Sequence, residues 1–174
     1  MGAERVIAIE PDPRTRNILL RNLKLNKITH VAVLREALWN KSGERASIML
    51  SSKSGLSSVM RKPTESVGQI EVRTATLDEI VRRQGLNRVD FVKIDVEGAE
   101  LRVIEGCEEL LAEFKPLLLV EVKGEKERLF KLMEERGYMV LGPYSYGENY
   151  FFVPIERVEL LLSLIHISEP TRPY

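Results

Sequence analysis

Three acidic side chains lie at or near the ends of apolar runs, where they could form one polar site. The run RVIAIE ends at Glu10, the run VDFVKI leads into Asp95, and LLLVEV carries Glu121 near its end. In an open parallel sheet, ligands bind in the crevice beyond the carboxyl ends of the strands. We therefore expect these carboxylates on the rim of one site, where such a group can orient or deprotonate a hydroxyl.

Other residues that could do chemistry give weaker signals. Three carboxylates can hold Mg²⁺, but acids this dispersed do not identify a hard-cation site, and we predict no metal. The single cysteine, Cys107, lacks the companions of a zinc site or an intramolecular disulfide, and packing is its expected role. Neither His30, before its strand, nor His166, near the C-terminus, is placed as a general base.

The N-terminal residues predict a strand, a helix and a second strand. A strand over residues 5–10 precedes the turn Pro-Asp-Pro, in which Asp12 can cap a helix and Pro13 fits its first turn. Asn26 marks the end of that helix, and a strand over residues 31–38 follows. This βαβ unit should have a right-handed crossover.

The stretch VDFVKIDVEGAE, residues 89–100, organises the rest of the chain. Its nearly continuous apolar run predicts a strand covered on both faces, and Gly98 and Ala99 open the next helix without steric bulk. Further elements are expected as follows: a returning hairpin strand over 46–50, a strand over 69–74, a helix over 76–85 begun by the capping box TLDE, helical segments on either side of Gly106 that end at Lys115, a strand over 117–122, a helix over 125–136, and a hairpin of 138–141 with 150–153. The alternation predicts an α/β fold: a doubly wound, Rossmann-like, mostly parallel sheet with an antiparallel C-terminal hairpin.

Length and composition indicate one domain, over residues 1–154. The chain has 174 residues, 44% apolar and 30% charged, with 26 basic and 26 acidic residues. Zero net charge argues against a nucleic-acid partner or an anionic membrane surface. The longest apolar run, residues 160–167, is far shorter than the roughly 20 residues of a membrane span, and we expect a cytoplasmic protein. Residues 155–174 do not extend the pattern and are interpreted as a non-native or disordered tail.

Six short motifs occur in an order that resembles one enzyme family. They are EPDP at 10–13, REALWNKSG at 35–43, GLSSV at 55–59, TLDEI at 76–80, KIDVEGAE at 93–100 and KPLLLVEV at 115–122. Together they resemble the FkbM-type family of S-adenosylmethionine-dependent methyltransferases, over about residues 5–153. The resemblance implies a class I methyltransferase fold that binds S-adenosylmethionine and methylates an oxygen of a small molecule or glycan.

The same resemblance implies roles for individual cofactor-binding residues. Glu10, followed by Pro11, would accept hydrogen bonds from the ribose hydroxyls, and Ala37 and Leu38 would border the adenine. Asp95 would lie near the methionine end of the cofactor, beside the acceptor, as the catalytic residue. The reaction would displace the methyl group from the sulfonium by a substrate oxygen, a step that depends strongly on positioning.

The acceptor side of the site would be formed by other segments. Ser57 and Ser58 belong to a Ser-, Gly- and Lys-rich stretch that is typical of a binding loop, although a solvated linker explains it too. Glu97 and Glu121 would also face the acceptor, although Glu97 could simply begin the helix. Lys93 is expected to form an ion pair with Asp95 or Glu121, since a buried cation needs a partner.

One departure from the family pattern concerns the N-terminal part of the fold. The family places another strand and a Gly-rich turn before the strand that ends in Glu10, whereas only residues 1–4 precede it here, and no G-x-G occurs. That turn brings backbone close to the cofactor, which requires glycine. The absent strand would lie between the strands that end in Glu10 and Asp95. We therefore expect a truncated, inactive chain.

Simpler interpretations and other functions stay open. Glu10 could be a surface acid that caps the adjacent helix, and Asp95 could be an acid stabilised by a helix dipole. A nicotinamide-dependent Rossmann enzyme would use Glu10 for the dinucleotide ribose, but it should show a Gly-rich turn and a second mononucleotide half. A non-catalytic binding module that keeps the fold without its cofactor turn is the third possibility.

Overall fold

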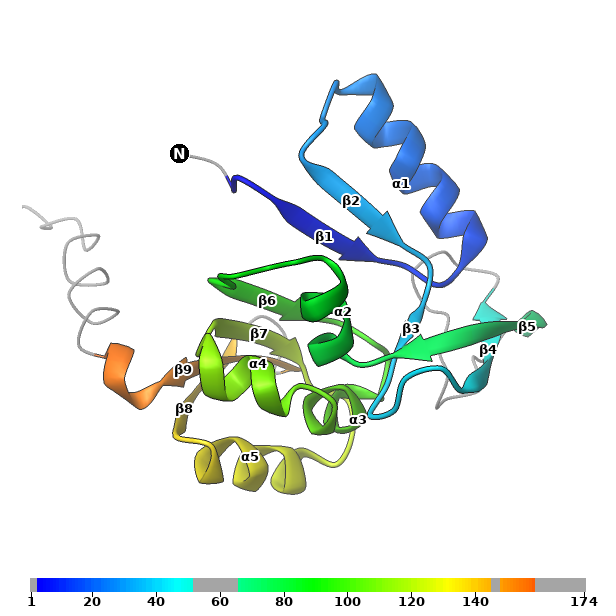
Figure 1. Ribbon diagram of the computed structural model, residues 1–174. Helices are drawn as coiled ribbons and strands as arrows, with labels where there is room; N and C mark the ends of the chain where they lie inside the picture. The colour runs from blue at the N-terminus through cyan, green and yellow to red at the C-terminus, as the bar shows by residue number, and fades with distance from the viewer. Residues whose placement is uncertain (1–2, 52–65, 145–147, 159–174) are drawn as a thin grey trace, which may run out of the picture.

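Short apolar runs bounded by caps and turns form the strands and helices of the computed structural model, which describes residues 3–51, 66–144 and 148–158 (Figure 1). In chain order they are β1 (Val6–Ile9), α1 (Pro13–Leu25), β2 (Val31–Leu34), β3 (Ala37–Leu38), β4 (Arg45–Ser51), β5 (Ser66–Ala75), α2 (Leu77–Arg83), β6 (Phe91–Ile94), α3 (Glu100–Glu105), α4 (Glu108–Glu113), β7 (Leu117–Glu121), α5 (Lys126–Glu135), β8 (Tyr138–Tyr144), β9 (Asn149–Pro154) and a 3₁₀ turn (Ile155–Arg157). The predicted alternation of strands and helices is confirmed.

The strands pair in three groups of mixed direction. The orders are β1-β2, β3-β5-β4 and β6-β7-β9-β8. The pairs β1–β2, β3–β5 and β6–β7 are parallel, whereas β4–β5, β7–β9 and β8–β9 are antiparallel. The antiparallel C-terminal hairpin is therefore confirmed, and the expectation of a mostly parallel sheet is wrong for the described residues.

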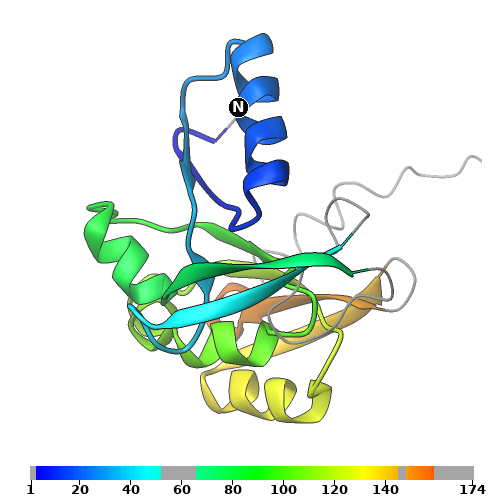
Figure 2. The same cartoon turned by 90° about the vertical axis from the view of Figure 1, so that its right-hand side faces the viewer.

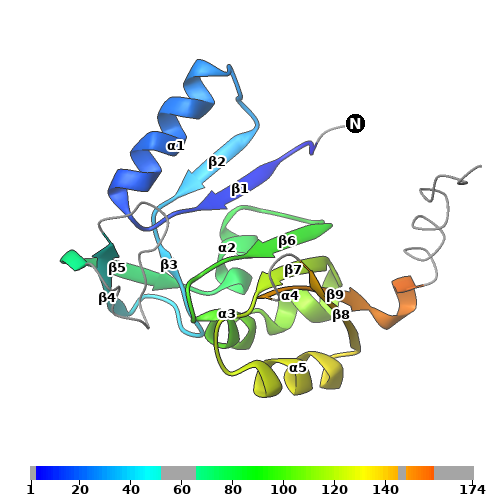
Figure 3. The same ribbon diagram turned by 180° about the vertical axis from the view of Figure 1, so that it is seen from behind.

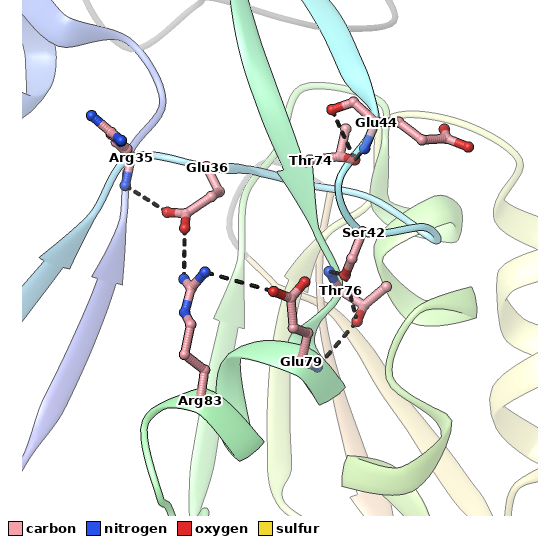
Figure 4. Close-up of polar contacts among 8 residues, drawn as sticks. All are labelled: Arg35, Glu36, Ser42, Glu44, Thr74, Thr76, Glu79 and Arg83. Carbon is pink, nitrogen blue, oxygen red and sulfur yellow. Dashed lines mark hydrogen bonds and ion pairs between the residues drawn. The ribbon is translucent and has the colours of Figure 1, made fainter.

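The strand predicted over residues 31–38 is broken at Arg35 and Glu36. β2 bonds to β1, whereas β3 pairs with β5 at Ala37↔Thr74 and Leu38↔Ala75. Figure 4 shows the contacts at this break: the Glu36 carboxylate accepts from the Arg35 amide at 3.0 Å and forms a 2.6 Å ion pair with Arg83 of α2. The hairpin predicted between the strand over 46–50 and the strand before it is also wrong. β4 pairs instead with β5, the strand that comes after it.

Helix α2 begins at the predicted cap. The Thr76 hydroxyl accepts a hydrogen bond from the amide of Glu79 at 3.1 Å. The Thr76 amide donates to the Ser42 hydroxyl at 2.9 Å, which attaches the turn before β4 to the start of α2 (Figure 4). This second contact joins the segment between β3 and β4 to helix α2.

The hydrophobic core lies between the β6-β7-β9-β8 sheet and helices α2 to α5. Alternate residues of β7 point into it, with Leu118 and Val120 fully buried, and Leu129 and Met133 of α5 meet them from the helical layer. Cys107 belongs to this core, as predicted. None of the helices among the described residues is long and apolar enough to cross a membrane.

The β1–α1–β2 unit projects from this core, at the end of the molecule opposite α5 (Figure 1, Figure 2 and Figure 3). Helix α1 has no buried residue. Among the described strands, β1 bonds only to β2, and β6 bonds only to β7. β1 and β6 therefore each have one edge without a sheet partner in the described part of the chain, as do the end strands β2, β3, β4 and β8.

The C-terminal residues that the structure describes are attached to the domain. The Ile155 amide donates to the Gly137 carbonyl at 2.9 Å, and Lys115 forms a 2.6 Å ion pair with Glu156. Residues 159–174, most of the predicted tail, lie outside the described residues.

Candidate functional site

The ends of β1 and β6 border one pocket, with β3 and β4 forming another part of its wall. Its volume is about 100 Å³. It is lined by Ile9, Glu10, Pro11, Asp12, Thr15, Ala37, Leu38, Ile48, Asp95, Val96, Glu97 and Ala99. Six predicted site residues, Glu10, Pro11, Ala37, Leu38, Asp95 and Glu97, thus line the same cavity. Their predicted roles stay predictions.

Glu10 is held in a rigid turn between β1 and α1. Its amide donates to the Leu34 carbonyl at 3.0 Å, and its Oε1 accepts from the Asp12 amide at 2.8 Å. Arg16 donates to the carbonyls of Glu10 and Pro11, each at 3.0 Å. Partial burial raises the pKa of Glu10 by desolvating its carboxylate. The carboxylate is therefore positioned by backbone contacts while it borders the pocket.

Asp12 explains the shape of this turn. Its side chain is buried and caps α1 by accepting from the Arg14 amide at 2.9 Å, while the Arg14 guanidinium pairs with it at 2.7 Å. A buried carboxylate is stable only when its oxygens are satisfied, and these contacts satisfy them. The predicted cap is confirmed, and it also forms part of the pocket wall.

Apolar side chains supply the wall beside Glu10. Ala37 and Ile48 are buried, and Leu38 is partly buried. β3 is held in place on both sides, because the Trp39 amide donates to the Ala75 carbonyl at 3.0 Å and Glu36 pairs with Arg83. This surface can contact a flat apolar group next to a carboxylate.

Asp95 follows β6 and lies among charged partners. Lys93 forms the predicted ion pair with it, at 3.2 Å. Its carboxyl also lies within hydrogen-bonding range of Glu121 at the end of β7. Desolvation opposes ionisation of Asp95, but the contacts with Glu121 and Lys93 outweigh it and lower the pKa of Asp95.

Glu121 lies beside Asp95, at the end of β7. Desolvation and the neighbouring Asp95 raise its pKa, although Lys123 at 3.0 Å opposes the rise. When protonated, the Glu121 carboxyl donates to the Asp95 carboxylate. Glu121 does not line the pocket itself, so it acts on the pocket through Asp95.

The turn between β6 and α3 carries Glu97 into the pocket wall. Glu97 and Gly98 have φ values of 55° and 104°, and α3 begins at Glu100, so the predicted helix start at Gly98 and the simpler interpretation of Glu97 are both wrong. The fully buried Glu100 accepts from the Gly98 amide at 2.7 Å, and this hydrogen bond stabilises the turn. Desolvation raises the pKa of Glu100.

A sequence profile described as "Methyltransferase FkbM domain" matches residues 1–140. The chain belongs to the FkbM methyltransferase family. The FkbM match agrees with two similar proteins: "Methyltransferase sdnD" of Sordaria araneosa is 26% identical over 166 residues (77% of this chain, 64% of that protein), and "Methyltransferase 1" of Beauveria bassiana strain ARSEF 2860 is 23% identical over 156 residues (78% and 63%). This FkbM chain therefore spans about 64% of the length of these relatives.

A solved structure supports the fold of the FkbM domain. The crystal structure of the methyltransferase FkbM from Methylobacillus flagellatus KT superposes with a TM-score of 0.54 at 20% identity. The match covers 86% of this chain and 36% of that one. At this identity it supports a mixed α/β methyltransferase-type fold and says nothing of ligands.

Sequence reasoning missed several residues of the FkbM pocket. Thr15 lies in the first turn of α1, beyond the Pro-Asp-Pro motif, and its position there was the available signal. Val96 and Ala99 lie one and two residues from Glu97 in the motif KIDVEGAE, so that motif was the available signal for their place in the pocket wall. Ile48 gave no signal, because its place follows from the pairing of β4 with β5. Ser57 and Ser58 lie outside the described residues.

Proposed function

We propose that this FkbM domain takes part in S-adenosylmethionine-dependent methylation of a hydroxyl group on a small molecule or glycan. The observation that carries the proposal is that carboxylates from two separate strand ends, Glu10 and Asp95, border one pocket beside an apolar wall. A doubly wound arrangement of the complete domain is part of this proposal.

The chemistry of the pocket residues fits the adenosyl part of the cofactor. Glu10 accepts hydrogen bonds from the ribose hydroxyls, because its turn is fixed by backbone contacts and its carboxylate borders the cavity. Ala37, Leu38 and Ile48 contact the adenine. When bound, the cofactor supplies an electrophilic methyl group on a sulfonium.

Asp95 is proposed to act on the acceptor. Its lowered pKa keeps it ionised, so it can accept a hydrogen bond from the acceptor hydroxyl and orient that oxygen or take its proton. Glu97 and Glu121, together with Ser57 and Ser58, are proposed to face the acceptor. The reaction gains most from alignment, which rigid β-strand ends supply.

We further propose that the site is completed by a parallel strand between β1 and β6. Neither of these strands bonds to the other, and each has a single sheet partner among the described strands. The cavity volume of about 100 Å³ is also below the roughly 300–1,000 Å³ of ligand pockets. On this view the chain by itself binds the cofactor weakly and is inactive.

Titration calorimetry with S-adenosylmethionine tests both proposals. It is run on this chain and on a version extended at its N-terminus, with NAD⁺ as the competing ligand. Binding of S-adenosylmethionine by the extended form alone supports both proposals. Binding of neither ligand by either form favours a non-catalytic module, and binding of NAD⁺ alone favours a nicotinamide enzyme.

A Glu10→Gln variant of the binding form tests the ribose contact. Hydrogen bonds to a charged group contribute about 1.5–3 kcal/mol, so the affinity should fall roughly 10- to 150-fold. Gln keeps an acceptor for the Asp12 amide, so the turn should persist. Glu71→Gln, at an exposed side chain of β5, is the matched control and should leave the affinity unchanged. An unchanged affinity in Glu10→Gln contradicts the assignment.

A further inference from the structure

Lys123 connects two segments of the acidic side of the pocket. It follows β7, and its Nζ lies 2.7 Å from Glu97 Oε1 and 3.0 Å from Glu121 Oε1. The side chain of Lys123 is only 14% exposed, and those of Glu97 and Glu121 are 16% and 23% exposed. Ion pairs this shielded from solvent are screened weakly, unlike surface pairs.

The ammonium of Lys123 also acts on two further carboxyl groups. Its charge lowers the pKa values of Asp95 and of buried Glu100, although desolvation is the largest influence on both. The charge of Lys123 itself is preserved: desolvation disfavours it, but Glu97 and Glu121 outweigh this and raise the pKa of Lys123. One cation is therefore shared by four acids: Asp95 and Glu97 from the segment after β6, Glu100 from α3 and Glu121 from β7.

The turn that Lys123 binds needs an external restraint. Glu97 adopts the left-handed conformation at φ 55°, which a residue with a side chain rarely takes unless its surroundings hold it there. Gly98 is restrained by Glu100 at 2.7 Å, and Glu97 is restrained by Lys123. The segments also pack closely, since a Cβ at Gly124 would lie 3.8 Å from the Gly98 carbonyl oxygen.

We propose that Lys123 is a positioning residue: by bridging Glu97 and Glu121 it fixes the turn after β6 and holds Asp95 at the pocket. The role in methyl transfer rests on the function proposed above, whereas the bridge itself can be tested without any cofactor. Asp95 is flanked by Lys93 on β6 and by Glu121 and Lys123 at the end of β7, with Glu97 and Glu100 in the turn and helix that follow it and Glu10 across the pocket.

The first test follows the side-chain carboxyl ¹³C signals of Asp95 and Glu121 through a pH titration. In Lys123→Met both carboxyls should titrate at higher pH than in the wild type, because a charge that favours their ionised forms is lost. Lys123→Arg should restore both titrations toward the wild type. Lys115→Met, which breaks the exposed pair with Glu156, is the matched control and should change neither. Unchanged titrations in Lys123→Met overturn the proposal.

The second test removes the bridge without removing the lysine. In Glu97→Gln the amide of Gly98, which donates to Glu100 at 2.7 Å, should exchange with solvent at least about tenfold faster than in the wild type, while amides of α5 should exchange as before. This variant keeps the buried cation paired with Glu121, so it also serves if Lys123→Met does not fold. Unchanged exchange in the turn overturns the positioning role. Neither test contains S-adenosylmethionine, so both can succeed or fail independently of the proposed function. That function is tested separately by the calorimetry described above.

Discussion

Gly106 is the position at which a single methyl group should disturb the fold most. It lies between α3 and α4, and a Cβ there would be 2.4 Å from the Trp39 carbonyl oxygen, 3.0 Å from the Asn40 Cα and 3.2 Å from the Thr76 Cγ2. Two of these atoms are backbone, so rotating a side chain cannot relieve the contact. Gly106→Ala must therefore push the segment after β3 away from the helices.

The size of the effect follows from how firmly that segment is held. Restoring a 3.0 Å separation from the Trp39 oxygen requires a movement of 3.0 − 2.4 = 0.6 Å. The segment resists, because the Trp39 amide bonds to the Ala75 carbonyl at 3.0 Å and the Asn40 side chain donates to Glu105 at 2.8 Å. Overpacking costs about 1–3 kcal/mol, and the Gly→Ala entropy gain offsets about 0.4–1 kcal/mol. Taking about 2 kcal/mol for overpacking and about 0.7 kcal/mol for the entropy gain, we expect a net loss of about 1.3 kcal/mol.

Urea unfolding and thermal melting measure this loss. A loss of about 1.3 kcal/mol corresponds to a fall in Tm of roughly 3–5 °C for a domain of this size. Gly124→Ala is the matched control, because its new Cβ would meet only an ordinary contact at 3.8 Å; it gains the entropy term of about 0.4–1 kcal/mol without the clash and should be at least as stable as the wild type. A Gly106→Ala protein as stable as Gly124→Ala would refute the reasoning.

Three further predictions concern charged or buried groups. Arg83→Met should lower the unfolding free energy by about 1 kcal/mol at pH 7, since the Glu36 side chain is only 18% exposed, whereas Arg82→Met, at an exposed pair, should cost almost nothing. Arg83 outweighs desolvation and lowers the pKa of Glu36, so this difference should shrink below about pH 4, when urea titrations are repeated in acid. Desolvation raises the pKa of Glu100, so the native protein keeps the Glu100 carboxyl protonated at higher pH than the unfolded chain does. The unfolding free energy of the wild type, relative to that of Glu100→Gln, should therefore fall as pH rises through the raised native pKa. A difference between the two unfolding free energies that is constant with pH, measured by urea unfolding, would contradict this. Cys107 is fully buried and desolvation raises its thiol pKa, so a thiol reagent should label it only as fast as the protein unfolds, as labelling rates across urea concentrations will show.

Features with local signals were predictable from the sequence. Asp12 and Thr76 cap helices because a short polar side chain before an apolar period can accept from the next amides, and both do so in the structure. Glu10 and Asp95 were placed at strand ends by counting along apolar runs, and the ends of β1 and β6 bring both to one pocket.

Features that depend on a distant partner were not predictable. The run over residues 31–38 is apolar enough for one strand, but the chain breaks at Arg35 and Glu36, where Glu36 pairs with Arg83 of α2, and β3 pairs with β5 instead of extending β2. β4 pairs with the same later strand, so both errors in the sheet involve β5, a partner far along the chain that local sequence does not identify.

Lys123 shows why charge composition says little about a site. Equal numbers of acidic and basic residues argue only against a generally basic surface, and the folding of β6 beside β7 gathers acids from both strand ends next to one shielded lysine. Electrostatic energy depends on separation and burial, and neither is a property of the sequence position alone. Since Asp95 and Glu121 would repel each other without that cation, the acidic pocket and Lys123 must be understood together. A relative in which the lysine is replaced by an uncharged residue should therefore lack an ionised acid at the position of Glu97 or Glu121. In this chain, double-mutant cycles between Lys123 and each of these acids measure the interaction energy on which that expectation depends.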